Sequence, residues 1–437
     1  MKISIIGLGK LGLPFAFFLA SKKNKVIGYD LNTRIKEKID RNFKDIEPNL
    51  NKYIKKNKNN FKCENNLNNL IKETKITFIV LPTPSLKDGS FSNKFILDCL
   101  KKIIEPLKKK KNKKHLIVIT STVSPGSCEE SFIPYLNKKG LKNGKDFSII
   151  YNPHFIAQGT TIYNLEKPDL LLLGSDSEKS YNAIKKFYSK IYKPNVFKKT
   201  SLREGEIAKI AINSYITSKI SFANYISELC ERNANTDAEK VLDVIGQDKR
   251  INHSYLKIGT KFSGPCFPRD NIALSNYSRK MGINSIIPDK NDAINKLQTK
   301  RLLQILKKII KNRKNPNIGI SGMTYKNNTN IVKNSQGDDF LKLIIKSKIK
   351  YKNIFLSDDY IKASDVENKK RKIFLQKNKI KFIKDSDIVF LMYNNKNSHL
   401  NKYKGQKTKY VVDCWRTIKK IPKKMIKIDL GRYSKFI

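Results

Sequence analysis

The chain has few cysteines, and none has the spacing that metal sites or disulfide frameworks need. Its six cysteines are scattered without CxxC pairs, which argues against a zinc site and favours a reducing compartment. No apolar run of about 18 or more residues occurs, and no cationic and apolar leader precedes the first strand. These absences predict a soluble, cytoplasmic protein that has no membrane span and no metal site.

Acidic residues are also scarce. The 38 Asp and Glu residues stand against 89 Lys and Arg, which gives a formal net charge of +51. Such a charge raises the possibility of nucleic-acid binding. The lysines, however, are spread over the whole chain among abundant Asn and Ile, without a basic arm or a basic patch that contains aromatic residues. We therefore expect no nucleic-acid partner, although the positive field would attract anionic ligands such as nucleotides.

The length of 437 residues is too great for one ordinary hydrophobic core, so two or three domains are expected. Hydrophobic residues make up 39% of the chain, and the 22 Phe and 19 Tyr provide large side chains for these cores.

A glycine-rich turn lies between the first two predicted strands, residues 2–6 and 25–29. Gly7-Leu8-Gly9-Lys10-Leu11-Gly12 leads into an apolar helix. Its three glycines suit a tight turn, close approach of the backbone to a pyrophosphate, and close packing of helix on strand. Asp30, at the end of the second strand, would accept hydrogen bonds from a ribose and repel a 2′-phosphate, which favours NAD over NADP. The alternative is a glycine-rich packing turn.

Two further predicted strands end in polar clusters. Ile76–Leu81 runs into Thr83, and Leu116–Thr120 runs into Thr122. In a doubly wound sheet, ligands gather at the carboxyl ends of the strands, which is where both threonines fall. Each threonine could instead be a simple end-of-strand cap.

A long helix is predicted in the middle of the chain. Ser201 and Glu204 have the spacing of a capping box, and no Gly or Pro occurs from Glu206 to Ile245. Lys209 and Asn213 are four residues apart, so they share one face of this otherwise apolar helix. They form either a solvated stripe or a pair of polar groups that point into a site.

The last part of the chain alternates between strands and helices again. A Lys-rich helix is expected at about residues 291–312, and it is followed by strands near residues 317–320, 353–356, 388–391 and 410–412. This pattern predicts a second parallel sheet of Rossmann type. Its first turn lacks GxGxxG but carries Lys326 and Lys333, which suit phosphate binding or are ordinary surface lysines.

The segment Gly259–Asp270 is the strongest candidate for chemistry. Cys266 lies in a turn shaped by glycine and proline, with Lys261 and Arg269 nearby to favour its thiolate. If this turn leads into a helix, Asp270 lies one helical turn from the sulfur. The pattern indicates a nucleophile with an acid/base partner, while the alternative is a buried structural cysteine.

Taken together, these motifs resemble the UDP-glucose/GDP-mannose dehydrogenase family along essentially the whole chain. The resemblance implies two Rossmann-like doubly wound parallel-sheet domains joined by a central long-helix region. The implied domains are an NAD-binding domain (1–198), a helical dimerisation domain that carries the cysteine loop (199–295), and a domain that binds the UDP part of the substrate (296–437). The motifs that carry the resemblance are Gly7–Pro14, Pro82–Pro84, Ser121–Gly126, Asn152–Phe155, Ala208–Asn213, Gly264–Asp270 and Gly322–Ser335.

The resemblance also implies a mechanism. Two hydride transfers to NAD oxidise the C6 alcohol of a nucleotide-sugar, and Cys266 holds the intermediate first as a thiohemiacetal and then as a thioester. Lys209 and Asn213 would stabilise the oxyanion, Asp270 would transfer protons, and Thr122 would position a water.

The implied ligand contacts extend over the whole chain. Arg250 matches an arginine that, in the family, reaches the substrate of the neighbouring subunit. A homodimer is expected, because the long central helix offers an isologous surface. The implied cofactor-binding residues are Gly7, Gly9, Leu11, Gly12, Asp30, Thr83, Thr122 and Lys333. The implied substrate-binding residues are Lys209, Asn213, Arg250, Tyr255, Lys257, Gly259 and Lys326.

Some positions depart from the family pattern. His154 and Gln158 stand where the family usually has glutamates, and glutamine cannot act as a base. Thioester hydrolysis would therefore rely on Thr122, Asp270 and ordered water, or be slow, while His154 could take part of the role. Arg416 follows its preceding aspartate, Asp413, by one residue more than is usual, which makes it a weak candidate for a substrate contact.

Oxidation of UDP-glucose to UDP-glucuronate is the default reaction that this resemblance predicts. The same chemistry on UDP-N-acetylmannosamine, UDP-N-acetylglucosamine or GDP-mannose is the nearest alternative. A catalytically impaired binder of nucleotide-sugars or nucleic acid is an alternative of another class.

Overall fold

The computed structural model describes residues 1–41, 47–110, 114–311, 313–365, 372–393 and 409–436. Its contacts divide the chain into two compact units. The N-terminal unit comprises Met1–Ile212 and Asn276–Ile283, and the C-terminal unit comprises Asn213–Ser275 and Asn284–Ile437. The boundaries of the three domains expected from the sequence stay a prediction. No helix in the described part of the chain is long and apolar enough to cross a membrane.

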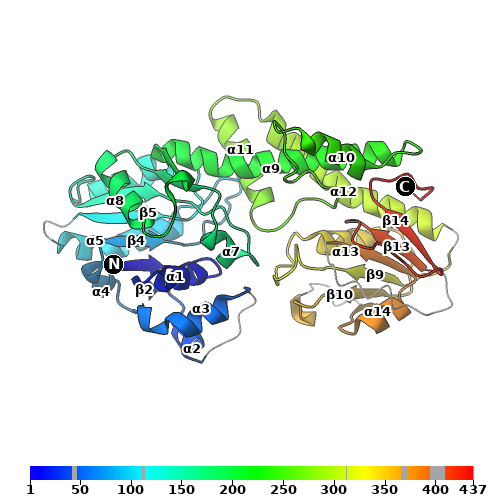
Figure 1. The fold of residues 1–437 in the computed structure, drawn as a ribbon, viewed down its shortest axis with the longest axis horizontal. Helices are drawn as coiled ribbons and strands as arrows, with labels where there is room; N and C mark the ends of the chain where they lie inside the picture. Colours follow the sequence, from blue (N-terminus) through cyan, green and yellow to red (C-terminus); the bar gives the residue numbers. More distant parts are fainter. Residues whose placement is uncertain (42–46, 111–113, 312, 366–371, 394–408, 437) are drawn as a thin grey trace. The chain divides into compact units, whose positions relative to one another are not determined.

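The N-terminal unit contains an eight-stranded sheet with the order β3-β2-β1-β4-β5-β6-β7-β8 (Figure 1). Its first six strands are parallel, whereas β7 pairs antiparallel with β6, through Tyr151 and Gly174, and parallel with β8. The strands are β1 (Lys2–Ile6), β2 (Lys25–Tyr29), β3 (Phe61–Cys63), β4 (Ile76–Ile79), β5 (His115–Ile119), β6 (Phe147–Tyr151), β7 (Leu171–Gly174) and β8 (Phe197–Thr200).

Helices cover both faces of this sheet. Along β5, Leu116 and Val118 contribute to one hydrophobic core, and Ile117 and Ile119 contribute to the other. This alternation follows from the period of two in a strand and makes the central strands apolar on both faces. The helices are α1 (Gly12–Ser21), α2 (Arg34–Asp40), α3 (Leu50–Asn57), α4 (Leu67–Glu73), α5 (Lys94–Lys108), α6 (Ile133–Lys138), α7 (Thr161–Glu166) and α8 (Glu178–Tyr188), together with the short turns η1 (Lys58–Asn60), η2 (Ser127–Phe132) and η3 (Pro194–Val196).

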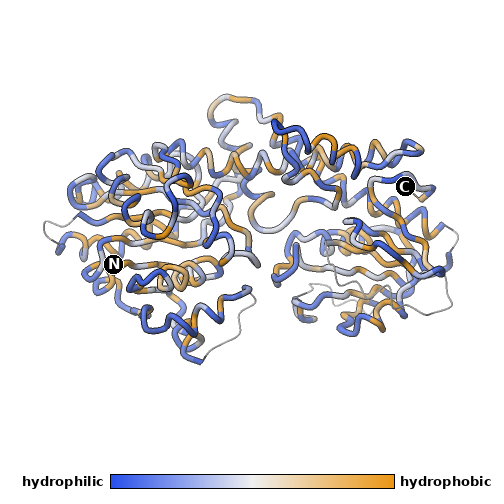
Figure 2. The backbone as a smooth tube through the Cα atoms, in the orientation of Figure 1, coloured by the Kyte–Doolittle hydropathy of each residue, from blue (hydrophilic) through white to orange (hydrophobic). Residues whose placement is uncertain are grey.

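The C-terminal unit contains a six-stranded parallel sheet with the order β11-β10-β9-β12-β13-β14. This is the same order as that of the first six strands of the N-terminal unit. Figure 2 shows hydrophobic residues concentrated along the strands of each sheet. The elements are β9 (Ile318–Ser321), α13 (Gln336–Lys346), β10 (Ile354–Ser357), η4 (Ala363–Asp365), β11 (Ile373–Leu375), α14 (Lys379–Asp385), β12 (Ile388–Leu391), β13 (Lys409–Asp413) and β14 (Met425–Asp429). The prediction of two Rossmann-like sheets is confirmed.

The first turn of this second sheet repeats the geometry of the first turn of the chain. Gly7 and Gly322 both have left-handed φ angles, +96° and +98°. A Cβ on Gly12 would overlap the carbonyl oxygen of Gly7, and a Cβ on Gly337 would overlap that of Gly322. The C-terminal turn therefore keeps two of the three glycine positions without the GxGxxG spacing.

Four further helices complete the part of the chain that the structure describes. The capping box that starts the first of them is confirmed, because Ser201 N donates to Glu204 Oε2 at 2.8 Å and Glu204 N donates to Ser201 Oγ at 3.2 Å. The last helix begins at Ile286 rather than near Asn291, since Pro288 lies in its first turn, where a missing N–H costs no helical hydrogen bond. Residue 312, where this helix was predicted to end, lies outside the described residues. These helices are α9 (Leu202–Glu231), α10 (Ala238–Gln247), α11 (Phe267–Lys280) and α12 (Ile286–Ile310).

Candidate active site

The turn between β1 and α1 has the shape of a dinucleotide cradle. A Cβ on Gly9 would meet no atom within 4 Å, so the backbone is open on that side. Leu8 N donates to Asp30 Oδ2 at 2.7 Å, which holds the carboxylate of Asp30 beside the turn. Gly12 begins α1, so the positive end of the dipole of this helix faces the same region. The open backbone, the helix N-terminus and the carboxylate fit a pyrophosphate with an attached ribose.

The structure brings the two predicted threonines together at the carboxyl ends of β4 and β5. The hydroxyl of Thr83 is buried and donates to the carbonyl oxygen of Thr122 at 2.6 Å. Next to it, Ser121 Oγ accepts from Leu81 N at 2.9 Å and donates to Leu81 O at 2.7 Å. The ends of these two neighbouring strands are therefore fixed to each other, and the side chain of Thr122 is half-buried.

Lys209 and Asn213 are both buried, at 6% and 8% exposed, so they do not form a solvated stripe. The ammonium of Lys209 donates to the carbonyl oxygen of His154 at 3.0 Å and lies 4.7 Å from the ring centre of Phe155. The loop after β6 is thereby attached to α9.

The imidazole of His154 does not suit the role of a general base near neutral pH. Burial, together with the positive charge of Lys209, lowers the pKa of His154 to about 3. The ring packs edge-on against Phe15, with their centres 4.5 Å apart. His154 therefore serves as a packing residue in the loop after β6. Because it does not titrate near neutral pH, it cannot supply the base that Gln158 lacks.

Cys266 is exposed and immediately precedes α11. The helix begins as the sequence predicts, because Asp270 N donates to the carbonyl oxygen of Cys266 at 2.8 Å. Asp270 is only 1% exposed. Its Oδ2 accepts from Asn213 Nδ2 at 2.6 Å, and its Oδ1 lies 3.5 Å from Arg269 Nε. The carboxylate of Asp270 and the amide of Asn213 are thus hydrogen-bonded to each other, one helical turn after Cys266.

Lys261 was expected to favour a thiolate at Cys266, but its ammonium pairs with a carboxylate elsewhere. The ammonium of Lys261 is mostly buried and forms an ion pair with Asp339 of α13. The carbonyl oxygen of Lys261 accepts from Gln336 Nε2 at 3.0 Å. Lys261 therefore ties the loop before Cys266 to the start of α13.

Aromatic rings pack against the glycines of this loop. A Cβ on Gly259 would come within 2.7 Å of the indole of Trp415, and a Cβ on Gly264 within 2.5 Å of the ring of Tyr325. Lys326 Nζ lies 5.8 Å from the ring centre of Tyr325. The structure thereby places Lys326 beside the turn that contains Cys266, although the two are far apart in the sequence.

Other predicted ligand contacts lie on the surface of the C-terminal unit. The guanidinium of Arg250 is exposed and binds Asp248, with Nη2 2.6 Å from Oδ2. Lys257 and Lys333 are exposed as well. Tyr255 is 47% exposed, but its ring packs edge-on against that of Phe267, the residue after Cys266, with the ring centres 6.2 Å apart. The structure therefore places Tyr255 beside the turn that contains Cys266.

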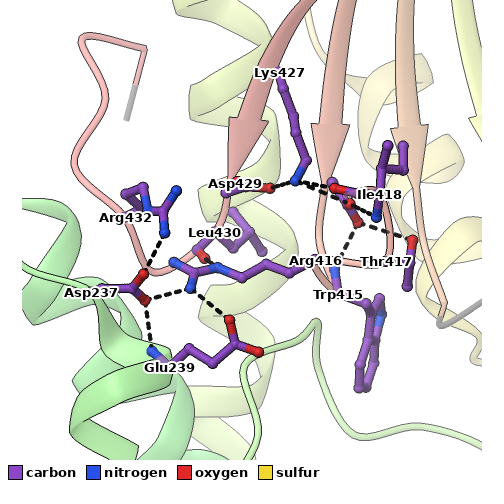
Figure 3. A network of polar contacts seen from close by, with 11 residues as sticks. Asp237, Glu239, Trp415, Arg416, Thr417, Ile418, Lys427, Asp429, Leu430 and Arg432 are labelled. Carbon is purple, nitrogen blue, oxygen red and sulfur yellow. Dashed lines mark hydrogen bonds and ion pairs between the residues drawn. The ribbon is translucent and has the colours of Figure 1, made fainter. Parts of the chain in front are cut away.

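Arg416 has a role that the sequence did not indicate (Figure 3). Its Nη1 forms ion pairs with Asp237 and Glu239 at the start of α10, and its Nε donates to the carbonyl oxygen of Leu430 at 2.9 Å. Arg432 also reaches Asp237, with Nη2 2.5 Å from Oδ2. The guanidinium of Arg416 joins two parts of the C-terminal unit, so we do not assign it a substrate contact.

Glu206 was not predicted from the sequence as a site residue. It is completely buried in α9 and accepts hydrogen bonds from the loop after β5. A carboxylate three residues before Lys209, on the same helical face and among apolar residues, was the signal that could have identified it.

Comparisons with known proteins agree with this geometry. The family model described as the UDP-glucose/GDP-mannose dehydrogenase family, NAD binding domain, matches residues 1–192, and the central-domain model of the same family matches residues 203–297. The UDP-glucose 6-dehydrogenase of Rickettsia felis is 30% identical over 382 residues, which cover 85% of this chain and 81% of that protein.

Two solved structures resemble the whole chain. A UDP-glucose dehydrogenase from Pyrobaculum islandicum has a TM-score of 0.88 at 23% identity and covers 99% of this chain and 98% of its own. A UDP-D-ManNAc dehydrogenase from Pyrococcus horikoshii has a TM-score of 0.82 at 22% identity, with 99% of each chain covered. At these identities the two structures support the fold alone.

Proposed function

Because the chain belongs to the UDP-glucose/GDP-mannose dehydrogenase family, we propose that it oxidises the C6 alcohol of UDP-glucose to the carboxylate of UDP-glucuronate. Membership of the family makes it an NAD-dependent oxidoreductase of the nucleotide-sugar dehydrogenase type. The observation that carries the proposed mechanism is the exposed Cys266 one helical turn before Asp270, whose carboxylate accepts a hydrogen bond from Asn213. The choice of UDP-glucose is supported by the Rickettsia relative.

The residues of the first turn fit the cofactor. The open backbone at Gly9 leaves room for a pyrophosphate, and Asp30 is placed to accept hydrogen bonds from a ribose. When bound, NAD accepts one hydride in each of the two oxidations. We assign cofactor binding to Gly7, Gly9, Leu11, Gly12, Asp30, Thr83, Thr122 and Lys333.

Cys266 acts as the nucleophile in this proposal. Loss of two electrons from the C6 alcohol gives an aldehyde, and the sulfur adds to its carbonyl carbon to form a thiohemiacetal. Loss of two more electrons gives a thioester. Water then attacks the thioester carbonyl, and the C–S bond breaks to release the carboxylate and restore the thiol. Asp270, one turn along α11, moves protons to and from this centre.

Lys209 and Asn213 stabilise the negative charge that develops on the substrate oxygen. Both are buried, which strengthens their interaction with that charge because water screens it less. Thr122 positions the attacking water. Since Gln158 cannot act as a base and His154 has a pKa of about 3, the hydrolysis step depends on Thr122 and on Asp270.

The loop before Cys266 forms the substrate side of the proposed site. Lys326, beside the ring of Tyr325, supplies a positive charge for the anionic nucleotide-sugar. We assign substrate binding to Lys209, Asn213, Arg250, Tyr255, Lys257, Gly259 and Lys326.

We also propose that the protein is a homodimer, formed through helices of the C-terminal unit. Tyr215, Phe222 and Tyr225 of α9 and Val241 and Val244 of α10 are exposed apolar residues, with Val244 71% exposed. A second copy that covers this face would bury it isologously. Sedimentation should give a dimer that Val244→Glu weakens and that Ile380→Glu, an exposed control on α14, leaves intact. A monomeric wild type would refute the proposal.

The enzyme proposal is tested by counting NADH per molecule of UDP-glucose at exhaustion. Two NADH are expected for the wild type and for the control Cys63→Ser, and only a trace or a stalled intermediate for Cys266→Ser. One NADH with accumulated aldehyde would show that the Gln158 substitution blocks the second half of the reaction.

The same assay separates the alternatives. Turnover of an N-acetylated or GDP-linked sugar in place of UDP-glucose would keep the chemistry and change the substrate. Binding without any NADH would favour an impaired binder of nucleotide-sugars, and tight, salt-sensitive binding of DNA would favour a nucleic-acid partner. The absence of a nucleic-acid partner and the cytoplasmic location stay predictions.

A further inference from the structure

Glu206 is a buried carboxylate that connects α9 to the loop after β5. Its Oε2 accepts from Gly126 N at 2.6 Å, and its Oε1 accepts from Cys128 N at 2.9 Å. The first of these bonds is short, as is typical of hydrogen bonds to an ionised acceptor. A buried carboxylate is costly unless such donors compensate for its lost hydration, so the two amides and the carboxylate depend on one another.

The loop that Glu206 holds carries Thr122. At its start, the carbonyl oxygen of Thr122 is fixed by Thr83 and the side chain of Ser121 is fixed by Leu81. At its end, Gly126 adopts a left-handed φ of +92° and the η2 turn begins. The loop is therefore anchored on both sides of the segment that contains Thr122, and Glu206 is the anchor at its end.

The same face of α9 holds a second loop. Lys209 follows Glu206 by three residues, so both project from one side of the helix. Its ammonium binds the carbonyl oxygen of His154, in the loop after β6. One face of α9 therefore binds the loops that follow the adjacent parallel strands β5 and β6. These loops lie at the edge of the sheet where ligands gather.

We propose that Glu206 is a positioning residue for the oxidation, because its two backbone hydrogen bonds fix the Thr122 loop against the helix that presents Lys209. This inference rests on the proposed function, which gives Thr122 and Lys209 their tasks. Glu206 acts through the loop backbone and exchanges no proton with the substrate.

The ionisation of Glu206 gives this role a measurable signature. Burial raises the pKa of Glu206 to about 7, although hydrogen bonds from Cys128 and Gly126 oppose the rise and nearby Glu129 adds to it. A protonated carboxyl replaces one acceptor position with an O–H donor, so it holds the two amides less well. The loop is therefore held more firmly above pH 7 than below it.

Other charged groups lie around this contact. Glu129 and Glu130 of η2 both pair with Arg203 of α9, and the carboxylate of Glu130 lies against Gly126. Asp176, before α8, acts electrostatically on the thiol of Cys128, and Lys209 lies further along α9. Burial raises the pKa of Cys128 well above its usual value, and the nearby carboxylates add to this rise, so the thiol stays neutral. Glu206 is therefore the group at this contact whose pKa lies near neutrality.

The test compares Glu206→Gln with Glu204→Gln, which removes the same charge from an exposed position of the same helix. The kcat of Glu206→Gln should fall about tenfold to hundredfold, while its affinity for NAD is kept. The acid limb that Glu206 gives to the wild-type kcat profile near pH 7 should be absent from this variant. Glu204→Gln should match the wild type in both respects. An unchanged kcat together with an unchanged acid limb in Glu206→Gln would overturn the proposal.

A second measurement, on the wild type, covers the case in which Glu206→Gln does not fold. Hydrogen exchange should show that the amides of Gly126 and Cys128 lose protection, relative to their neighbours, as the pH falls from 8 to 6. Protection that does not depend on pH would contradict the proposal. If the wild type oxidises no nucleotide-sugar, the proposed function fails separately, and this exchange measurement still decides whether Glu206 controls the loop.

Discussion

The open backbone at Gly9 leads to a prediction that separates folding from cofactor binding. Gly9 does not have a left-handed φ, and a Cβ added there would meet nothing within 4 Å. Gly9→Ala should therefore change the free energy of unfolding by no more than about 0.5 kcal/mol, or stabilise the fold slightly by restricting the unfolded chain.

Cofactor affinity should respond differently. The added methyl group would occupy the side of the turn that a pyrophosphate approaches. Loss of one hydrogen bond from a backbone N–H to a charged phosphate costs about 1.5–3 kcal/mol, and each 1.4 kcal/mol corresponds to a factor of about ten in affinity. The Kd for NADH, measured by fluorescence titration, should rise about tenfold to hundredfold.

Gly12→Ala is the matched control for this experiment. A Cβ at Gly12 would overlap the carbonyl oxygen of Gly7, so this variant should lose about 1–3 kcal/mol of stability or more, because neither backbone can move away easily. The assignment of Gly9 would be wrong if Gly9→Ala bound NADH with the affinity of the wild type. It would also be wrong if both variants lost stability to the same extent.

Two further predictions concern stability. Arg416→Met should lower the Tm of the C-terminal unit, because it leaves Asp237 with one arginine partner instead of two. An unchanged Tm in calorimetry would refute the structural role of Arg416 in joining two parts of this unit. The protein should lose stability as the pH falls below about 6.5, which is the ordinary pKa of histidine. Burial lowers the pKa of His115 and of His154 to about 3. Below about pH 6.5 the unfolded chain therefore binds protons that the folded chain does not, so acid favours unfolding. The dependence of Tm on pH should accordingly be smaller in His115→Gln, and an equal slope would contradict this reasoning.

The sequence predicted the elements whose pattern is local. Residues 2–6 and the glycine turn identify β1 and α1, and the capping box at Ser201 marks the start of α9. Short strands such as β3 and β8 were not predicted, because the pairing of three or four residues at a sheet edge depends on neighbours that are distant in the chain. β14 was also missed, although residues 426–429 (Ile-Lys-Ile-Asp) alternate between apolar and polar.

The candidate site likewise combines features that the local sequence predicts with contacts between segments that are distant in the chain. The turn at Cys266 and the one-turn spacing to Asp270 follow from the local sequence. The bond from Asn213 to Asp270 and the contact between Gly264 and Tyr325 join segments that only the fold brings together. Arg416 illustrates the reverse case, because a charged residue near a family motif turned out to be held by Asp237.

The repeated turn of the C-terminal unit gives a final prediction. Asp358 follows β10 as Asp30 follows β2, and its Oδ2 accepts from Met323 N at 2.8 Å, much as Asp30 accepts from Leu8 N at 2.7 Å. Asp358, however, is 4% exposed, and its Oδ2 also accepts from the amide and the hydroxyl of Thr324, at 3.0 and 3.1 Å. These donors belong to the protein and occupy the carboxylate that a ribose would need.

Replacement by asparagine should therefore lower mainly the stability at Asp358 and mainly the affinity for NADH at Asp30. Asp358→Asn turns an amide N–H₂ or a neutral oxygen toward several N–H donors, so it should cost about 1–3 kcal/mol of stability and leave the Kd for NADH unchanged. Asp30→Asn should cost less stability than Asp358→Asn, because Asp30 is half-buried and accepts from two amides, Leu8 N and Asn32 N. It should weaken NADH binding and reduce the discrimination against NADPH, because the negative charge that repels a 2′-phosphate is lost. Urea unfolding and fluorescence titration of both variants would decide the matter. A loss of NADH affinity in Asp358→Asn at full stability would mean that the second turn still binds a dinucleotide.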